Sequence, residues 1–404
     1  MSLTTLHPPL DRPRQIALDL PAGLTLLIFI ALVLNPLLGS LAALIFLGAG
    51  GLLFLSNVQH SVRALLQYWF VMLIPAYCAL SAFWSDYPPE TFRASIQLAL
   101  TLGIAVLIAT RLPPRILVRC LFIVFFLAMV ASAVFGRVRD DTGAWVGIFG
   151  SKNAFAAIVS VFILTSIAAA ADRQASRLQL GAALFGMLIG LPILLLAQSA
   201  GATIVLVPSA GMLLLVLFGR RFTPAQRRFG IGALLLLLVV GGVFALGYGS
   251  QILDLVLSLS NKDATLTGRT DLWAVADKII ARNPLWGVGY RAFWIQGNAP
   301  AEELWAQFGI STRSGFNFHN TYISNAVEIG YVGVVLEVLA VIGAIVGVFL
   351  WALRRPSAEA GFFAAYLTTA ICGSFVEVAI FFPFSLPSLL IVCALVYAMR
   401  ASRT

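Results

Sequence analysis

Apolar runs of bilayer-spanning length follow one another along most of the chain. A helix needs about 20 mainly apolar residues to cross the hydrocarbon core, and these runs lack the two-residue alternation of membrane β-strands. Since only helices and closed barrels satisfy their backbone hydrogen bonds in lipid, the pattern predicts transmembrane helices. It places twelve of them, at 22–38, 40–57, 66–83, 94–110, 116–135, 153–171, 179–197, 199–218, 229–248, 320–351, 360–382 and 384–399.

One long polar segment, residues 249–319, interrupts the series. Within it, residues 270–282 have the period of an amphipathic helix, with charged residues opposite an apolar face. That face consists of Leu272, Val275, Ala276, Ile279 and Ile280. We therefore expect residues 1–404 to form a single transmembrane domain with one large loop that carries a helix at the membrane surface.

Composition supports this class, because 60% of the residues are hydrophobic, only 11% are charged, and the mean hydropathy is +0.96. A soluble domain needs more charge to cover its surface, so the fold class is an all-α polytopic membrane protein. The first apolar run is followed at once by a second and not by a small-residue cleavage site, which predicts a retained first span. The four cysteines lie in apolar runs without metal-ligand spacing, so neither a disulfide framework nor a metal site is expected.

The distribution of basic residues predicts the orientation of the chain in the membrane. If both termini are cytoplasmic, one set of segments holds 16 of the 26 Lys and Arg residues. These are Arg12, Arg14, Arg63, Arg111, Arg115, Arg119, Arg173, Arg177, Arg220, Arg221, Arg227, Arg228, Arg354, Arg355, Arg400 and Arg403. The positive-inside rule then places the long loop on the outer side. The net charge of +9 is explained by this topology and requires no nucleic-acid partner.

Of the three histidines, only His319 falls on the outer side in this orientation. Histidine is the most frequent general base, since a usable fraction of it is neutral near pH 7. The alternative is a residue at a helix start whose ring is satisfied by water or a carbonyl group. Arg269, in the sequence GRT, precedes the amphipathic helix, where a guanidinium and free backbone N–H groups can hold a phosphate. Its alternative role is nonspecific contact with lipid headgroups.

Lys152, at the start of the sixth predicted span, is suited to contact a pyrophosphate, and Arg137 and Arg291 add to an outer basic surface. Asp140 and Asp141 form a carboxylate pair on this side. Such a pair can bind a divalent metal, but adjacent carboxylates more often mark a solvated turn.

Three glutamates, Glu328, Glu337 and Glu377, fall within predicted spans, where an acid is costly and suggests function. Helical spacing puts neither Glu328 nor Glu337 beside His319, so packing or a neutral, hydrogen-bonded role is expected for them. The chain has no phosphate-binding glycine loop and no dinucleotide fingerprint. An enzyme acting on the outer face without a nucleotide requires a substrate that is already activated, and a lipid pyrophosphate sugar meets that requirement.

Five motifs occur in order along the chain: WSDYP (84–88), GIFGSKN (147–153), LTGRTDLW (266–273), NPLWGVGYRAFW (283–294) and HNTYISNAVEIGYVGVVLE (319–337). Together they resemble the O-antigen ligase/polymerase family, which comprises polytopic membrane glycosyltransferases of the bacterial envelope related to the GT-C class. The GRTDLW, GVGYRAFW and GSKN strings are more similar to exopolysaccharide repeat-unit polymerases than to ligases.

The resemblance implies a glycan donor on undecaprenyl pyrophosphate, inversion at its anomeric carbon, no metal and no cofactor. It also implies a periplasmic site at the bacterial inner membrane. His319 would be the base or the acceptor-positioning group, and Arg269 would hold the departing pyrophosphate. Lys152, Arg137, Arg291, Asn153, Asn320 and Tyr290 complete the expected substrate-binding set.

The chain departs from the family in the tight turn between the seventh and eighth predicted spans. Many members have a basic residue there, whereas this turn reads AQSAGAT (197–203). Lys152, Arg137 or Arg291 would have to supply the charge.

The acceptor is not evident from the residues. A ligase that transfers the glycan to lipid A–core is therefore the second hypothesis, and a transporter or flippase of lipid-linked glycans is the third. The lack of internal repeats and the concentration of polar motifs on one side argue against transport. A chain-length regulator protein is a further candidate partner of a polymerase.

Overall fold

The computed structural model describes residues 19–227, 229 and 268–403 of the chain. Its helices are α1 (Leu20–Val33), α2 (Asn35–Leu38), α3 (Ser40–Leu55), α4 (Val58–Gln67), α5 (Leu73–Leu80), α6 (Pro88–Arg111), α7 (Pro114–Phe135), α8 (Lys152–Ala170), α9 (Arg177–Leu196), α10 (Ala200–Phe218), α12 (Arg269–Arg282), α13 (Ala299–Gln307), α14 (Thr321–Arg354), α15 (Ala358–Ser374) and α16 (Leu386–Arg403). Short 3₁₀ turns cover Trp69–Met72, Ser81–Phe83 and Gly219–Arg221. One small antiparallel hairpin joins α7 to α8, with β1 (Arg137–Val138) paired to β2 (Trp145–Gly147).

Seven of these helices are long and apolar enough to cross a membrane, namely α6, α7, α8, α9, α10 with its following 3₁₀ turn, α14 and α16. The pair α3 and α4, bent by 101°, would make an eighth if it is one broken span. The protein is therefore an all-α polytopic membrane protein, and the count of twelve spans stays a prediction. The 14 residues of α1 extend only about 21 Å against a bilayer core of about 30 Å. The predicted span at 229–248 lies, apart from its first residue, outside the described residues.

The spans differ in how much of their surface the protein itself covers. In the most apolar window of α6, α8 and α16, 61–67% of the residues are buried, against 22% in α9 and in α10. Large apolar side chains on α9 are exposed at helical spacing, at Leu184, Leu188, Leu191 and Leu195. An exposed apolar stripe of this length would be unstable in water and is the surface expected to contact lipid.

The opposite face of α9 packs closely on α8 because it presents glycines. A Cβ on Gly186 would lie 2.6 Å from Ser166 Oγ, and one on Gly190 would lie 2.6 Å from Ile163 Cγ1. The four-residue spacing of the two glycines is the small-residue pattern that lets membrane helices approach each other.

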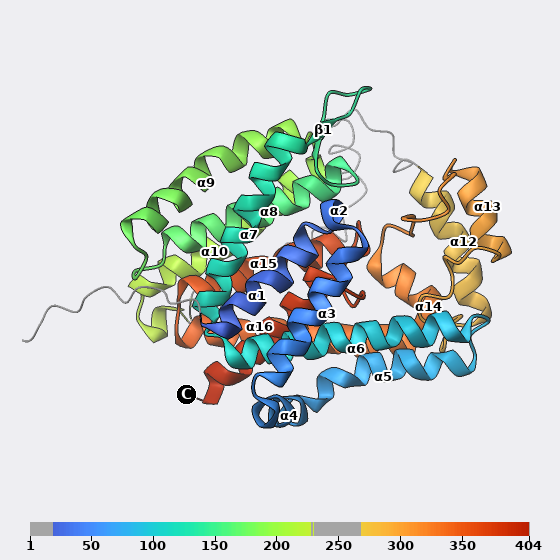
Figure 1. Cartoon of the computed structure of the whole chain (residues 1–404), viewed down its shortest axis with the longest axis horizontal. Helices are drawn as coiled ribbons and strands as arrows, with labels where there is room; N and C mark the ends of the chain where they lie inside the picture. The colour runs from blue at the N-terminus through green and yellow to red at the C-terminus, as the bar shows by residue number, and fades with distance from the viewer. Residues whose placement is uncertain (1–18, 228, 230–267, 404) are drawn as a thin grey trace, which may run out of the picture.

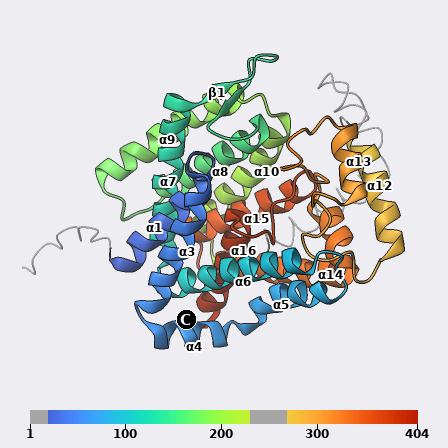
Figure 2. The ribbon, with the colours of Figure 1, turned by 45° about the vertical axis from the view of Figure 1, so that its right-hand side comes forward.

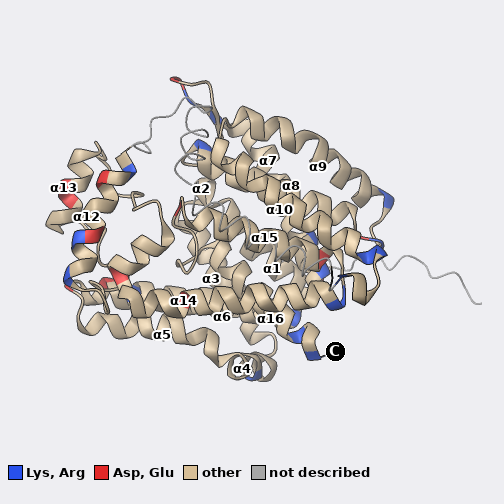
Figure 3. Cartoon of the chain, turned by 180° about the vertical axis from the view of Figure 1, so that it is seen from behind, with Lys and Arg blue, Asp and Glu red and all other residues tan. Residues whose placement is uncertain are grey.

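The connections between helices gather at two ends of the bundle (Figures 1 and 2). Residues 84–87, 136–151, 197–199, 283–320 and 375–385 lie at one end, together with α12 and α13. The connections 112–113, 171–176, 222–223 and 355–357 lie at the other end, near the C-terminus. Figure 3 shows Lys and Arg positions concentrated at the C-terminal end, whereas α12 and α13 carry both signs of charge. The predicted orientation assigns these two sets of connections to opposite sides of the membrane.

The polar end has its own small core beside the main one. It consists of Leu272, Ala276, Ile280, Phe293, Ala301, Leu304, Trp305, Phe318, Ala326 and Val327. We call this unit, made of α12, α13, their loops and the start of α14, the cap. The buried positions of α12 belong to the apolar face predicted from the sequence.

The cap is joined to the bundle at an interruption of α14. Gly330 has φ 63° and ψ −177°, so the helix breaks there and loses its own hydrogen bonds. Residues 284–289 replace them: the N–H groups of Val288 and Gly289 donate to the carbonyls of Val327 and Glu328 at 2.9 and 2.8 Å. In the other direction, the N–H of Tyr331 donates to the Pro284 carbonyl at 2.8 Å. Backbone groups freed inside a membrane protein must be satisfied in such a way.

The WSDYP motif and the preceding helix α5 also contact this joint. Trp84 Nε1, in the motif, donates to the Trp286 carbonyl at 3.1 Å, and the hydroxyl of Tyr77, in α5, donates to the Ile329 carbonyl at 3.1 Å. A Cβ on Gly289 would lie 2.5 Å from Ser85. Three of the motifs noted in the sequence, around 84, 286 and 330, therefore meet in one joint.

Replacing Gly330 by alanine should lower the free energy of unfolding by at least about 1–3 kcal/mol, because this φ/ψ region is essentially restricted to glycine. The added Cβ would also lie 2.3 Å from the Leu285 backbone. Thermal denaturation of the purified protein in detergent measures the effect. Gly343→Ala on the same helix is the control, since its Cβ would make only ordinary contact at 3.7 Å with Leu395. Equal melting temperatures of the two variants would contradict the role of the joint.

Candidate functional site

The two residues expected to be catalytic lie together at the polar end, and a glutamate joins them. His319 Nδ1 lies 3.2 Å from Glu377 Oε2, and an Arg269 guanidinium nitrogen lies 3.8 Å from Glu377 Oε1. The side chains of His319, Arg269 and Glu377 are 29%, 20% and 40% exposed, so all three are open to solvent or to a ligand.

The geometry determines which nitrogen of His319 can act as a base. An ionised carboxylate only accepts hydrogen bonds, so Nδ1 carries the proton that Glu377 accepts. Nε2 is then the unprotonated nitrogen, and it has no partner among the described residues. A carboxylate that holds Nδ1–H fixes the ring orientation and the tautomer and stabilises the imidazolium ion.

Helix α12 positions Arg269 beside this glutamate. Arg269 is the first residue of the helix, after Gly268 with φ 81°. Trp273 lies one turn later on the same face, and its Nε1 donates to the Phe318 carbonyl at 2.7 Å. The GRTDLW motif thus attaches α12 directly to the residue before His319.

His319 is held in an uncommon backbone conformation. Its φ is 49°, and its N–H donates to Asn317 Oδ1 at 2.7 Å. The next residue, Asn320, caps α14 by accepting from the N–H groups of Tyr322 and Ile323. Asn320 Nδ2 also donates to the Phe375 carbonyl at 3.2 Å, so both ends of its amide hold backbone in place. Non-glycine residues with positive φ cluster at functional sites, where the surrounding contacts enforce them.

Glu377 lies outside a helix, which corrects its predicted position inside the span 360–382. Helix α15 ends at Ser374, and the chain continues irregularly to Leu386. Two side chains from other segments hold this stretch in place. The Thr321 hydroxyl donates to the backbone carbonyl of Glu377 at 2.8 Å, and the Tyr290 hydroxyl donates to the backbone carbonyl of Phe381 at 2.8 Å. Glu377 therefore has an accessible carboxylate, and it is the site residue that the sequence analysis did not assign to the site.

Tyr290 and Arg291 lie next to this segment, in the cap. Tyr290 is only 1% exposed, and burial raises the pKa of its phenol. Its contacts in this structure are supporting ones, and contact with substrate stays a prediction.

The guanidinium of Arg291 lies over the Phe382 ring at 4.1 Å and 3.9 Å from the carboxylate of Glu328. The backbone N–H of Arg291 also donates to Glu328 Oε2 at 2.9 Å. Both the side chain and the backbone of Arg291 therefore stabilise the negative charge of this buried acid. Glu337, also buried, accepts from Asn325 Nδ2 at 2.5 Å. Both acids thus have hydrogen-bonded structural partners.

Lys152 and Asn153 contact the turn before α10, and Arg137 lies in the hairpin that precedes α8. Lys152 Nζ donates to the Gln198 carbonyl at 3.3 Å, and the Ser199 hydroxyl lies 3.1 Å from Asn153 Oδ1. Arg137 donates to the Phe149 carbonyl at 3.0 Å. No hydrogen bond or ion pair connects this group to His319 within the described part of the chain. Lys152 nevertheless puts a positive charge at the turn where this sequence lacks a basic residue.

Asp140 and Asp141 lie at the tip of the hairpin between α7 and α8. Arg139 makes a two-pronged contact with Asp141, with distances of 2.9 and 2.5 Å. No group of three or more His, Cys, Asp or Glu side chains positioned for a metal occurs in the described ranges.

Fold and site together define a polytopic membrane protein with a polar, solvent-accessible histidine site at one end of the bundle. Comparison with known proteins identifies the family. Residues 185–338 match the family described as O-Antigen ligase. This segment includes the Gln198 turn, Arg269, Arg291 and His319, but neither Lys152 nor Glu377.

The chain is also similar to the exopolysaccharide production protein ExoQ of Rhizobium meliloti (strain 1021). The two are 32% identical over 287 residues, which is 70% of this chain and 65% of that protein. This chain thus covers slightly less than two thirds of the length of its relative. Residues 185–338 thus match that family, and the two similarities confirm the resemblance of the motifs to the O-antigen ligase/polymerase family.

Replacing Arg291 by glutamine should lower the free energy of unfolding by about 3 kcal/mol, because the buried charge of Glu328 loses the positive guanidinium beside it. Combining it with Glu328→Gln should restore most of that loss. Chemical or thermal denaturation in detergent tests both variants. Arg313→Gln is the control, since the Arg313–Glu302 pair is exposed and should contribute less than about 1 kcal/mol. A double variant no more stable than Arg291→Gln would show that Glu328 is not the cause.

Proposed function

We propose that the protein is a membrane glycosyltransferase that polymerises undecaprenyl-pyrophosphate-linked oligosaccharide repeat units, with inversion at the anomeric carbon. The observation that carries this proposal is the grouping of His319, Glu377 and Arg269 at one end of a membrane bundle. The proposal also draws on the name of the ExoQ relative, an exopolysaccharide production protein.

In the proposed reaction, His319 acts as the general base. Its Nε2 removes the proton of an acceptor hydroxyl while the hydroxyl oxygen attacks the anomeric carbon of the donor sugar. The bond from that carbon to the pyrophosphate oxygen breaks on the opposite face. The proton ends on the imidazole, whose positive charge the Glu377 carboxylate stabilises. General base catalysis of this kind contributes about 10²- to 10⁴-fold to a rate.

Arg269 is proposed to hold the leaving pyrophosphate. Within the described residues its guanidinium makes the 3.8 Å ion pair with Glu377 and no hydrogen bond, so its donors are available for phosphate oxygens. Pyrophosphate is a good leaving group, and a fixed cation stabilises the charge that develops on it without proton transfer. Lys152 is proposed to supply the positive charge that the turn at Gln198 lacks, and to contact the leaving pyrophosphate as well.

Because Arg269 and Lys152 supply the positive charge, the proposed reaction is independent of metal and of any cofactor. We place the protein in the bacterial inner membrane with both termini cytoplasmic, twelve spans, a GT-C-like architecture and the site on the periplasmic face. The proposed partners are the lipid-linked donor, a glycan acceptor, membrane lipid and a chain-length regulator protein. Asn153, Asn320, Arg137, Arg291 and Tyr290 remain proposed substrate-binding residues.

The second candidate is an O-antigen ligase, which transfers the glycan to lipid A–core. It is favoured by the description of the family matched at residues 185–338. Both candidates use the same donor chemistry, so the described site supports either one, and only the acceptor separates them. A transporter or flippase of lipid-linked glycans is the third, and Glu328, Glu337 and Glu377 would be its candidate coupling groups.

The function is tested with purified protein in nanodiscs, given undecaprenyl-pyrophosphate oligosaccharide and no other acceptor, with products resolved on a gel. We expect a ladder of growing chains that is absent with His319→Ala, a variant that should still insert and melt normally. A single transfer that appears only when lipid A–core is added would establish the ligase instead. Failure under both conditions would favour transport, and full activity of His319→Ala would remove this residue from the mechanism.

Replacing Glu377 by glutamine should reduce the rate of transfer at least about tenfold, because the imidazolium loses its anionic partner and the tautomer is no longer fixed. The same assay measures the effect. Glu303→Gln, an exposed carboxylate in the cap, is the matched control. A Glu377→Gln variant as active as this control would remove the Glu377 carboxylate from the mechanism.

A further inference from the structure

The end of the bundle opposite His319 contains a polar cavity that the proposed reaction does not use. Its volume is about 430 Å³, within the range of about 300–1,000 Å³ typical of small-molecule pockets. Its polar lining consists of Arg115, Asp172, Arg173, Gln174, Arg220, Ser357 and Glu359. Four candidate spans begin or end around it, namely α7, α8, α10 with its 3₁₀ turn, and α14. The cavity therefore lies at the level of lipid headgroups.

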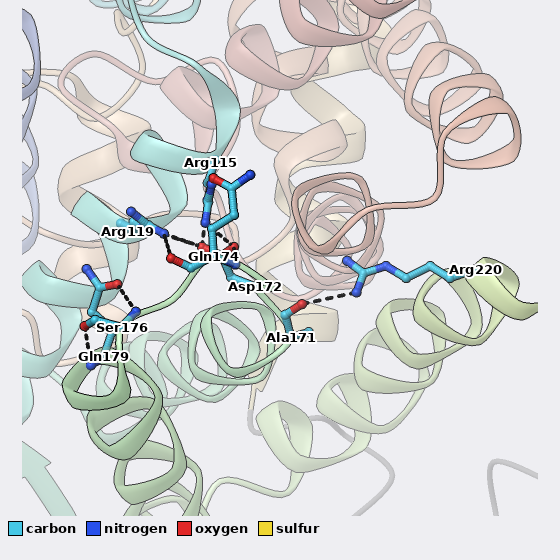
Figure 4. Close-up of polar contacts among 8 residues, drawn as sticks. All are labelled: Arg115, Arg119, Ala171, Asp172, Gln174, Ser176, Gln179 and Arg220. Carbon is cyan, nitrogen blue, oxygen red and sulfur yellow. Dashed lines mark hydrogen bonds and ion pairs between the residues drawn. The ribbon is translucent and has the colours of Figure 1, made fainter. Parts of the chain in front are cut away.

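One side of the cavity is a hydrogen-bonded framework around the carboxylate of Asp172 (Figure 4). Arg115 and Arg119, one turn apart on α7, both donate to the carboxylate of Asp172, with contacts of 2.6–3.1 Å. Burial would raise the pKa of Asp172, but the hydrogen bonds from Arg115, the Gln174 N–H and Arg119 lower it below its usual value. Ser176 and Gln179 close the loop by a reciprocal capping pair at the start of α9. The segment that carries Arg173 is thus held in place by its neighbours.

The other arginines of the cavity keep unused donors. Arg220 donates through one nitrogen to the Ala171 carbonyl at 3.1 Å, as Figure 4 shows. Arg173 is exposed, and in the described ranges no carboxylate lies within ion-pair distance of Arg173 or of Arg220. Arg115 donates to Asp172 through Nε and one terminal nitrogen. Its other terminal nitrogen makes no hydrogen bond within the described ranges.

The start of α15 lines the cavity. Ser357 caps this 17-residue helix by accepting from the Ala360 N–H, and Ala358 and Glu359 line the cavity. The first N–H groups of a helix and its dipole attract anions. Two arginines without a carboxylate partner and a helix N-terminus thus converge on one space, with Glu359 as the remaining acid on its wall.

We propose that this cavity binds a phosphate group, presented by an anionic lipid headgroup at the membrane surface opposite the His319 site. Arg173 and Arg220 make charge-assisted hydrogen bonds to the phosphate oxygens, while the Asp172 framework fixes the loop between α8 and α9. This site differs from the proposed transfer site in its residues, in its end of the bundle and in its ligand. It does not depend on the transfer reaction.

The test is native mass spectrometry of the protein in a neutral detergent, titrated with phosphatidylglycerol or with phosphatidylcholine of the same acyl chains. We expect the wild type to retain phosphatidylglycerol in preference to phosphatidylcholine. Each basic residue near a membrane surface contributes about fivefold to such binding, so Arg173→Gln/Arg220→Gln should weaken phosphatidylglycerol binding about 25-fold.

Arg177→Gln is the matched control, since Arg177 is an exposed arginine in the same region that does not line the cavity. Arg173→Gln alone, expected to cost about fivefold, keeps the test valid if loss of the Arg220 contact disturbs folding.

A parallel titration with inorganic phosphate distinguishes the two sources of the ligand. Displacement of phosphatidylglycerol at millimolar phosphate would extend the site to free phosphate, and no displacement would assign it to lipid. Equal retention of the two lipids, or identical binding by the control and the cavity variants, would overturn the proposal.

Discussion

Backbone hydrogen bonding without water is the constraint on which the polar end of this protein depends. Breaking α14 at Gly330 frees carbonyl and N–H groups that would be costly to leave unpaired in an apolar bundle. Residues 284–289 satisfy them, and this is possible only because Gly287 and Gly330 allow backbone to contact backbone. The break therefore places the cap on the bundle, and the cap in turn places Arg269 and His319.

The site is then assembled from segments that are distant in the chain. Arg269 begins α12, His319 ends the cap loop, and Glu377 comes from the irregular stretch between α15 and α16. Hydrogen bonds to the Phe318 and Phe375 carbonyls, from Trp273 and Asn320, tie these segments together away from the reactive side chains. His319 lies between these two ties with a positive φ, and its ring faces Glu377.

Much of this could be predicted from the sequence, and the limits have physical causes. The spans from α6 to α10 are continuous apolar runs, so their positions follow from hydropathy, and the period of 270–282 identifies the buried face of α12. Glu377 was missed because FVEVAIFFPF reads as the end of a helix by hydropathy alone, whereas tertiary hydrogen bonds end α15 at Ser374. Pro383 and the glycine and serine at 373 and 374 were the available signals. Similarly, no local pattern shows that Lys152 reaches the carbonyl of Gln198, 46 residues away.

The separate core of the cap has a consequence for how the site is positioned. Arg269 and His319 are both attached to that core, through α12 and Phe318. The segment of Glu377 is tied to the two residues that follow His319, by Asn320 and Thr321. All three side chains are therefore positioned by contacts at one end of the bundle, and not by the length of the spans that connect its two ends.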